Sequence, residues 1–117
     1  MQVSMFHNPR CSKSRETLKL LNEKGIQPEI RLYLETPPTE TQLSDVLKKL
    51  NMPPKHLIRF KEAVAAELGL SLADERPDAE WIRIMAEHPK LIERPIVIAG
   101  EKAVIGRPPE KVLSLLP

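Results

Sequence analysis

Polar and apolar residues follow a strand-like, then helix-like, then strand-like order in the first third of the chain. Residues 2–6 alternate and then reach the turn-forming His7-Asn8-Pro9, which predicts a short strand. A helix is expected from about Ser12 to a stop at Gly25. A second alternation over residues 30–34 predicts another strand. A right-handed crossover through the helix would place it parallel to the first strand. These elements form one βαβ unit.

The middle of the chain reads as helical. Thr39 and Gln42 have the spacing of a capping box ahead of apolar residues at helical intervals. Segments that contain proline or glycine separate the expected helices. These helices cover roughly 39–50, about Phe60 to Leu68, and a segment around Trp81, Ile82 and Met85 that ends before His88-Pro89. We therefore expect a helical insert over about 37–90.

The last part of the chain returns to strands. Residues 96–99 and 102–105 flank Gly100-Glu101, a two-residue turn that predicts an antiparallel hairpin. Pro108-Pro109 suits the first turn of a closing helix. The predicted order is a βαβ unit, a helical insert and a ββα unit, which is an α/β fold in a single domain over 1–117.

Composition and charge narrow the class of protein. The chain has 117 residues, of which 41% are hydrophobic and 29% charged, an ordinary balance for one globular domain. No apolar run approaches the length of a membrane span, and no signal pattern follows Met1, so we expect a cytoplasmic protein that binds no membrane. A net charge of +2 lacks the single-sign excess of general nucleic-acid binders, and no nucleic-acid partner is expected.

Cys11 is the only cysteine, so the chain has neither an intramolecular disulfide nor a CxxC pair. It lies in the turn between a strand and a helix start, where unpaired N–H groups and the helix dipole favour a thiolate. Lowering a thiol pKa from about 8.5 by ~2 units would raise the thiolate fraction at pH 7 from about 3% to about three quarters. Helix-start N–H groups also bind oxyanions. Nearby hydroxyl and basic residues are His7, Arg10, Ser12, Lys13, Ser14 and Arg15.

Four segments resemble the glutaredoxin-coupled arsenate reductase family. They are His7-Asn8-Pro9-Arg10-Cys11-Ser12-Lys13-Ser14-Arg15, Leu32-Tyr33-Leu34-Glu35-Thr36-Pro37, Glu93-Arg94-Pro95-Ile96-Val97-Ile98 and Gly106-Arg107-Pro108-Pro109. The resemblance runs end to end and is to the short version without a polar C-terminal tail. It implies a thioredoxin-like fold, reduction of arsenate or a similar oxyanion, and glutathione and glutaredoxin as partners. It implies no tightly bound cofactor, and we expect a monomer.

The resemblance also implies a role for individual residues. Cys11 matches the cysteine that attacks arsenate, His7 the histidine that promotes its ionisation, and Ser14 a hydroxyl that bonds the thiolate. The matching oxyanion-binding residues are Arg59, Arg94 and Arg107. Guanidinium groups suit such ligands because they form charge-assisted, forked hydrogen bonds. Pro95 is implied to follow a cis bond that faces the cysteine.

Structural readings of the same residues stay open. Cys11 could be a small buried side chain without a chemical role. His7 could serve only as a hydrogen-bonding residue at a strand end, and Ser14 only as a helix cap. Arg59 fits a solvated helix residue. A metal site is not expected, because the three histidines are scattered and no second cysteine exists.

Three other functions use similar residues. A cysteine phosphatase loop needs an arginine where this chain has Thr17, so the spacing excludes it. Regulators of the wider family that dock on RNA polymerase carry a CxxC switch, whereas this chain has Cys11-x-x-Ser14. A glutathione-dependent thiol oxidoreductase without arsenate activity remains the main alternative.

Overall fold

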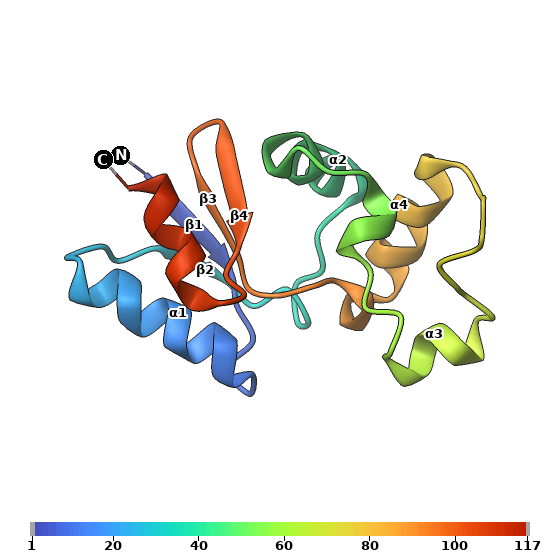
Figure 1. Cartoon of the computed structure of the whole chain (residues 1–117), viewed down its shortest axis with the longest axis horizontal. Helices are drawn as coiled ribbons and strands as arrows, with labels where there is room; N and C mark the ends of the chain where they lie inside the picture. The colour runs from blue at the N-terminus through green and yellow to red at the C-terminus, as the bar shows by residue number, and fades with distance from the viewer. Residues whose placement is uncertain (1, 117) are drawn as a thin grey trace. The chain divides into compact units, whose positions relative to one another are not determined.

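The computed structural model describes residues 2–116, and the chain divides into two compact units. The division falls after Thr36 and before Arg94. The two outer segments form one unit, called here the sheet unit, and Pro37–Glu93 forms the other, called the helical unit (Figure 1). The helical unit corresponds to the predicted insert over about 37–90. The prediction that 1–117 behaves as a single domain stays a prediction.

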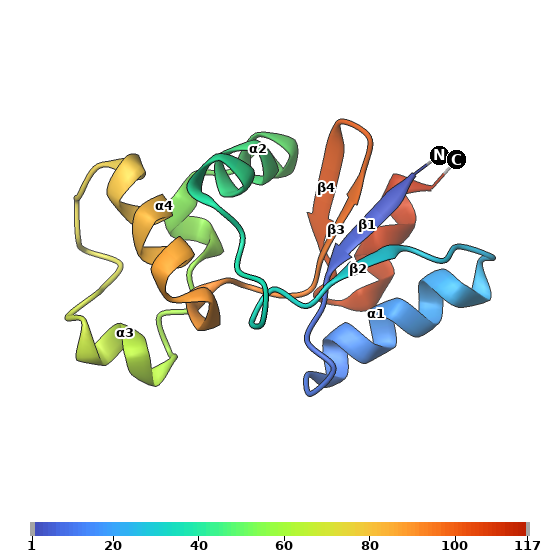
Figure 2. The same cartoon turned by 180° about the vertical axis from the view of Figure 1, so that it is seen from behind.

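The sheet unit is built on four strands in the order β2-β1-β3-β4 (Figures 1 and 2). The strands are β1 Val3–Phe6, β2 Glu29–Arg31, β3 Ile96–Ala99 and β4 Lys102–Ile105. β1 pairs in parallel with β2 and antiparallel with β3, and β3 pairs antiparallel with β4. The predicted βαβ unit, the hairpin and the α/β class are confirmed.

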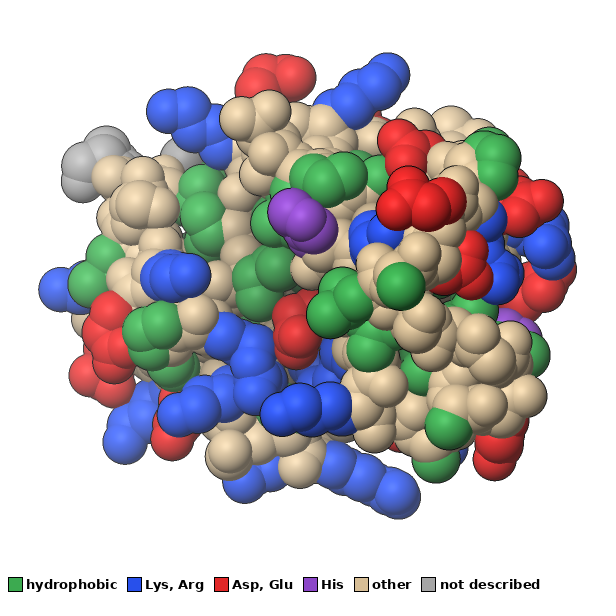
Figure 3. All heavy atoms as spheres, turned by 45° about the vertical axis from the view of Figure 1, so that its right-hand side comes forward, with side chains coloured by type: hydrophobic (Ala, Val, Ile, Leu, Met, Phe, Trp, Pro, Cys, Tyr) green, Lys and Arg blue, Asp and Glu red, His purple; other side chains and the backbone are tan. Residues whose placement is uncertain are grey.

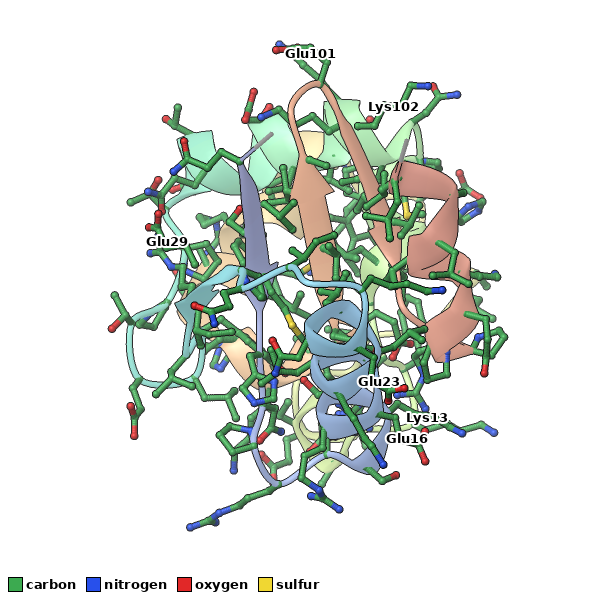
Figure 4. The ribbon with its side chains drawn as sticks, turned by 90° about the vertical axis from the view of Figure 1, so that its left-hand side faces the viewer. Lys13, Glu16, Glu23, Glu29, Glu101 and Lys102 are labelled. Atoms are coloured by element: carbon green, nitrogen blue, oxygen red, sulfur yellow. The ribbon has the colours of Figure 1, made fainter. Side chains whose placement is uncertain are left out.

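One face of this sheet is covered by two helical segments, α1 Ser12–Glu23 and the 3-10 segment η3 Pro109–Leu115. Figure 4 shows both of them in front of the sheet, with Lys13 and Glu16 along α1 and Glu101 at the tip of the hairpin. The buried residues between these layers are Val3, Met5, Leu21, Val97, Ala99 and Val112. Burying a side chain of this kind stabilises the fold by about 1.5–3 kcal/mol. This core fixes the start of α1 relative to the ends of β1 and β4.

Two predicted elements of the sheet unit differ from the structure. β2 ends at Arg31 rather than at residue 34, because the Leu32 carbonyl accepts hydrogen bonds from Glu35 N and Thr36 N, each at 2.9 Å, and so forms a turn. Tyr33 is buried in that turn and stacks on Phe6 with ring centroids 6.2 Å apart. The closing segment is a 3-10 helix instead of an α-helix.

The helical unit contains three α-helices and two 3-10 segments, listed as α2 Glu40–Leu50, η1 Pro54–Leu57, α3 Ala63–Glu67, α4 Asp78–Glu87 and η2 Pro89–Leu91. The predicted capping box at Thr39 and Gln42 is present. α3 is shorter than the predicted 60–68, because Glu62 has an extended backbone and begins the helix late. Trp81 is buried in this unit. Within residues 2–116 no helix has both the length and the apolar character needed to cross a bilayer.

Candidate functional site

Cys11 is the N-cap residue of α1. Its backbone is extended, its N–H donates to Asn8 O at 3.0 Å, and its carbonyl accepts the first helical bond from Arg15 N at 3.0 Å. The side chain is 9% exposed. An N-cap side chain ordinarily accepts hydrogen bonds from the N–H groups two and three residues on, which here belong to Lys13 and Ser14. The local sequence therefore places a sulfur where a helix start offers unsatisfied donors.

The pKa of the Cys11 thiol lies below its ordinary value. Burial is the largest single influence and raises the pKa, because it disfavours the charged thiolate. Four stabilising influences together outweigh burial, and they are the backbone N–H of Ser14, the charge of Arg94, the backbone N–H of Lys13 and the charge of Arg107. The helix start and the two arginines therefore favour the nucleophilic form of the sulfur.

The end of the hairpin brings Arg107 to the sulfur. Its Nη1 donates toward Cys11 Sγ at 3.9 Å and to the Arg94 carbonyl at 3.2 Å. Arg94-Pro95 is a cis peptide bond, as the resemblance implies, and Pro95 is buried. The structure thus places Arg107 beside Cys11 and Arg94 next to Arg107, although 96 positions separate Cys11 from Arg107 in the chain.

His7, Asn8 and Ser14 form a hydrogen-bonded group behind the cysteine turn. His7 Nδ1 lies 2.6 Å from Ser14 Oγ, and Asn8 N donates to the same hydroxyl oxygen at 3.0 Å. Ser14 is fully buried and His7 is 7% exposed. The Ser14 side chain is thus engaged by His7 and Asn8, while its backbone N–H acts on Cys11. The predicted hydroxyl bond from Ser14 to the thiolate stays a prediction.

The pKa of His7 lies below its ordinary value. Burial is the main cause that lowers the pKa of His7, and the nearby positive charge of Arg15 lowers it further. Burial and the Arg15 charge therefore favour the neutral imidazole, whose Nδ1 lies within hydrogen-bond distance of Ser14 Oγ. The direction of this shift depends on burial, which the sequence does not show; by residue type alone His7 is a potentially positive group.

Arg59 lies in the helical unit, just after the bridge between Ile58 and Ile92. Its Nη1 pairs with Glu62 Oε2 at 2.9 Å, and its Nε lies 3.9 Å from Glu93 Oε1. Its backbone N donates to Leu91 O at 2.8 Å. These contacts fix Arg59 within its own unit, and its implied role as an oxyanion ligand stays a prediction.

Several contributors to the site were missed from the sequence. The sequence marks Asn8 only as a turn residue, yet its N–H donates to Ser14 Oγ, its carbonyl accepts from Cys11 N, and its Oδ1 accepts from Arg10 N at 3.0 Å. Gly106 and Thr17 lie together behind Arg107. The signal for Asn8 was its place in the turn, and the signal for Gly106 was its position directly before a site arginine.

The surroundings of the cysteine turn favour an anion over a metal. Basic residues in the turn, in the first turns of α1 and at the sheet end are Arg10, Lys13, Arg15, Arg94 and Arg107. Figure 3 shows Lys and Arg side chains gathered in the lower half of the face that it presents. Residues 2–116 contain no cluster of three or more histidine, cysteine, aspartate or glutamate side chains suited to a metal ion. A thiolate, helix-start N–H groups and guanidinium groups together suit nucleophilic attack on a bound oxyanion.

Comparison with known proteins agrees with this site and fold. The model of the ArsC family matches residues 6–115. The chain is 53% identical over 116 residues to the uncharacterized protein YfgD of Escherichia coli, covering 98% of this chain and 97% of that one. It is 49% identical to an arsenate reductase of Haemophilus influenzae, covering 99% and 100% of the two chains.

A solved structure gives the same result. The structure of an arsenate reductase from Vibrio cholerae has a TM-score of 0.94 and 47% identity, covering 99% of this chain and 98% of that one. The thioredoxin-like fold that was predicted is confirmed. With a family model spanning nearly all of the sequence and close relatives over its full length, this chain belongs to the ArsC family.

Proposed function

We propose that this protein is an oxidoreductase that reduces arsenate to arsenite, with Cys11 as its single nucleophile and glutathione and glutaredoxin as electron donors. The observation that carries the proposal is the pairing of Cys11, whose thiol pKa is lowered, with the Arg107 guanidinium 3.9 Å from its sulfur. A thiolate supplies the nucleophile, and the guanidinium supplies a partner for the negative oxygens of arsenate. The arsenate reductases among its relatives add support.

The first step forms a bond between sulfur and arsenic. Arg94 and Arg107, with Arg59 as the proposed third ligand, bind the arsenate oxygens. The Cys11 thiolate attacks As(V), and one arsenate oxygen takes up protons and leaves as water. Ser14 serves the thiolate best when the His7 proton is on Nδ1, because the imidazole and Asn8 N then both donate to Ser14 Oγ and the hydroxyl proton is left to bond the sulfur.

The later steps need two external thiols, because the chain has one cysteine. Glutathione adds its sulfur to the arsenic of the Cys11 adduct, and a second water leaves. The glutaredoxin thiolate then attacks the glutathione sulfur and forms a disulfide with it. The electron pair of the broken arsenic–sulfur bond stays on arsenic, which becomes As(III). Water finally cleaves the bond from arsenic to Cys11, and arsenite and the free thiol are released. Such donors belong to a reducing compartment, which supports a cytoplasmic location.

A coupled assay with arsenate, glutathione, glutaredoxin and an NADPH-consuming glutathione reductase tests the proposal. We expect NADPH oxidation that depends on arsenate and is abolished in Cys11→Ser, because serine is a far weaker nucleophile at neutral pH. Mass spectrometry of the protein after exposure to arsenate and glutathione should detect an adduct on Cys11. Lys19→Gln, at an exposed position of α1 with no assigned role, is the control.

Two results would contradict this function. Glutathione exchange on Cys11 without any arsenate-dependent turnover would favour a thiol oxidoreductase with another substrate. Capture of RNA polymerase by both the native protein and Cys11→Ser, again without turnover, would favour a regulator.

A further inference from the structure

Thr17 is a fully buried hydroxyl residue on the inner side of α1. A buried hydroxyl needs a hydrogen-bond partner, because leaving water without one is costly. Thr17 Oγ1 donates to Lys13 O at 2.8 Å and lies 3.4 Å from Gly106 O, which is 89 positions away in the chain. Both acceptors are backbone carbonyls that share the single hydroxyl proton, and the bond to Lys13 O is the shorter of the two. The side chain therefore connects the first turn of α1 to the segment that follows β4.

The first acceptor belongs to a peptide group that acts on the cysteine. The carbonyl of Lys13 and the N–H of Ser14 are parts of one planar peptide group. That N–H is one of the groups that lower the pKa of Cys11. A hydrogen bond accepted by the carbonyl holds the plane of the group and polarises its N–H. The Thr17 hydroxyl thus helps to orient the Ser14 N–H, which stabilises the Cys11 thiolate.

The second acceptor adjoins the arginine beside the sulfur. Gly106 directly precedes Arg107, and its N donates to Pro95 O at 2.9 Å. A Cβ atom at position 106 would lie 2.7 Å from Thr17 Oγ1 and 3.0 Å from Pro95 Cγ. Gly106 is therefore enclosed between Thr17 and Pro95, and the position of this glycine decides where the Arg107 side chain begins.

We propose that Thr17 is a positioning residue of the Cys11 site: its one buried hydroxyl holds the Lys13–Ser14 peptide group and the Gly106–Arg107 segment where both reach the cysteine sulfur. Thr17 acts through these two groups and touches no reacting atom. The inference rests on the proposed function only in taking Cys11 as the nucleophile.

The test compares Thr17→Val, which keeps the shape but lacks the hydroxyl, with Thr17→Ser, which keeps the hydroxyl. The rate of Cys11 alkylation by iodoacetamide is measured against pH. In Thr17→Val we expect a pKa higher by about 0.5 to 1 unit and therefore, at a pH well below both pKa values, a rate lower by about 3- to 10-fold. Thr17→Ser and the control Thr41→Val, at an exposed position of α2, should stay within about twofold of the native rate.

A second measurement links the effect to Arg107. In an Arg107→Gln background, Thr17→Val should lower the alkylation rate by a smaller factor than in the native protein, because one of its two routes to the sulfur is already lost. No arsenate or thiol donor enters these measurements. A failure of arsenate turnover therefore leaves the test of Thr17 intact.

Two outcomes of the Thr17 comparison would overturn the assignment. One is a folded Thr17→Val with the native alkylation profile, and the other is a Thr17→Ser that loses as much reactivity as Thr17→Val, which would indicate packing rather than the hydroxyl. If circular dichroism shows that Thr17→Val is unfolded, Gly106→Ala decides, since its added carbon pushes on Thr17 Oγ1. That variant should raise the Cys11 pKa, and a folded Gly106→Ala with native reactivity would refute the proposal.

Discussion

At the scale of single residues, the site depends on a sulfur that occupies a helix N-cap. Serine, threonine and aspartate are common there because their oxygens accept hydrogen bonds from the first N–H groups of the helix. A neutral thiol is a weak acceptor, whereas a thiolate carries the charge that both the N–H groups and the helix dipole favour. Burial of Cys11 opposes ionisation, and the N–H groups and two arginines outweigh it. The helix start therefore selects the reactive form of the side chain.

The lowered pKa of Cys11 predicts the pH dependence of its reactivity. Alkylation by iodoacetamide requires the thiolate, so the rate falls as the pH drops through the pKa of the folded protein. We expect the midpoint of this profile to lie below about 8.5, the value of a free cysteine. The protein unfolded in guanidinium chloride is the control and should have its midpoint near that value. A native midpoint at or above the unfolded one would refute the favoured thiolate.

Arg94 and Arg107 should each contribute to both ionisation and anion binding. Replacing either by glutamine removes a positive charge near the sulfur, so the Cys11 pKa should rise. A lost charge-assisted hydrogen bond of about 1.5–3 kcal/mol should weaken oxyanion binding by roughly 10-fold or more. Protection of Cys11 from alkylation by arsenate or sulfate measures this affinity. Lys19→Gln, at an exposed position of α1, is the matched control, and equal protection in all three variants would remove the assigned roles.

The sequence predicted part of this site and missed the rest for a physical reason. The turn position of Cys11 follows from local patterns, and the family resemblance assigned Arg94 and Arg107 to the same site. The pKa of His7 and the partners of the Ser14 hydroxyl depend on burial and on differences of a few tenths of an ångström in the distances between atoms. Such quantities are set by tertiary packing, which residue spacing does not determine.

At the scale of elements, the sequence pattern predicted strands correctly where local preference and tertiary packing favour the same structure. The hairpin over Ile96–Ala99 and Lys102–Ile105 has both the alternation and the turn, and the structure confirms it. β2 stops early although Leu32 and Leu34 continue the alternation, since a turn at Leu32 buries the Tyr33 ring against Phe6. Alternation describes which side chains are apolar, but it does not show where the backbone leaves the sheet.

The capping box of α2 should contribute to the stability of the helical unit. Thr39 Oγ1 accepts from Gln42 N at 3.1 Å, and Gln42 Oε1 accepts from Thr39 N at 3.0 Å. Thr39→Ala removes the first of these bonds and should lower the free energy of unfolding by about 1 kcal/mol, as measured by urea titration. Thr41→Ala, at an exposed position of the same helix, should change it by less than about 0.5 kcal/mol. Equal losses in the two variants would contradict a capping role.

At the scale of the whole molecule, the chain forms two units, of which only one is continuous in sequence. The helical unit is one continuous segment, whereas the sheet unit needs both ends of the chain. Each unit spans about half of the 117 residues, a size at which a single hydrophobic core is only marginally stable by itself. Two direct chain connections join the units, at Thr36–Pro37 and at Glu93–Arg94. These facts favour cooperative unfolding over two independent domains.

Two probes can decide whether the chain behaves as one domain. Trp81 is the only tryptophan and is buried in the helical unit, so its fluorescence follows that unit. Pulsed hydrogen exchange of the β1 and β3 amides, read by mass spectrometry, follows the sheet unit. If neither unit is stable alone, both probes should give the same urea midpoint, since coincident transitions indicate two-state unfolding. A Trp81 transition at lower urea, with the strand amides still protected, would instead show two domains, with a sheet unit that stays folded when the helical unit is unfolded.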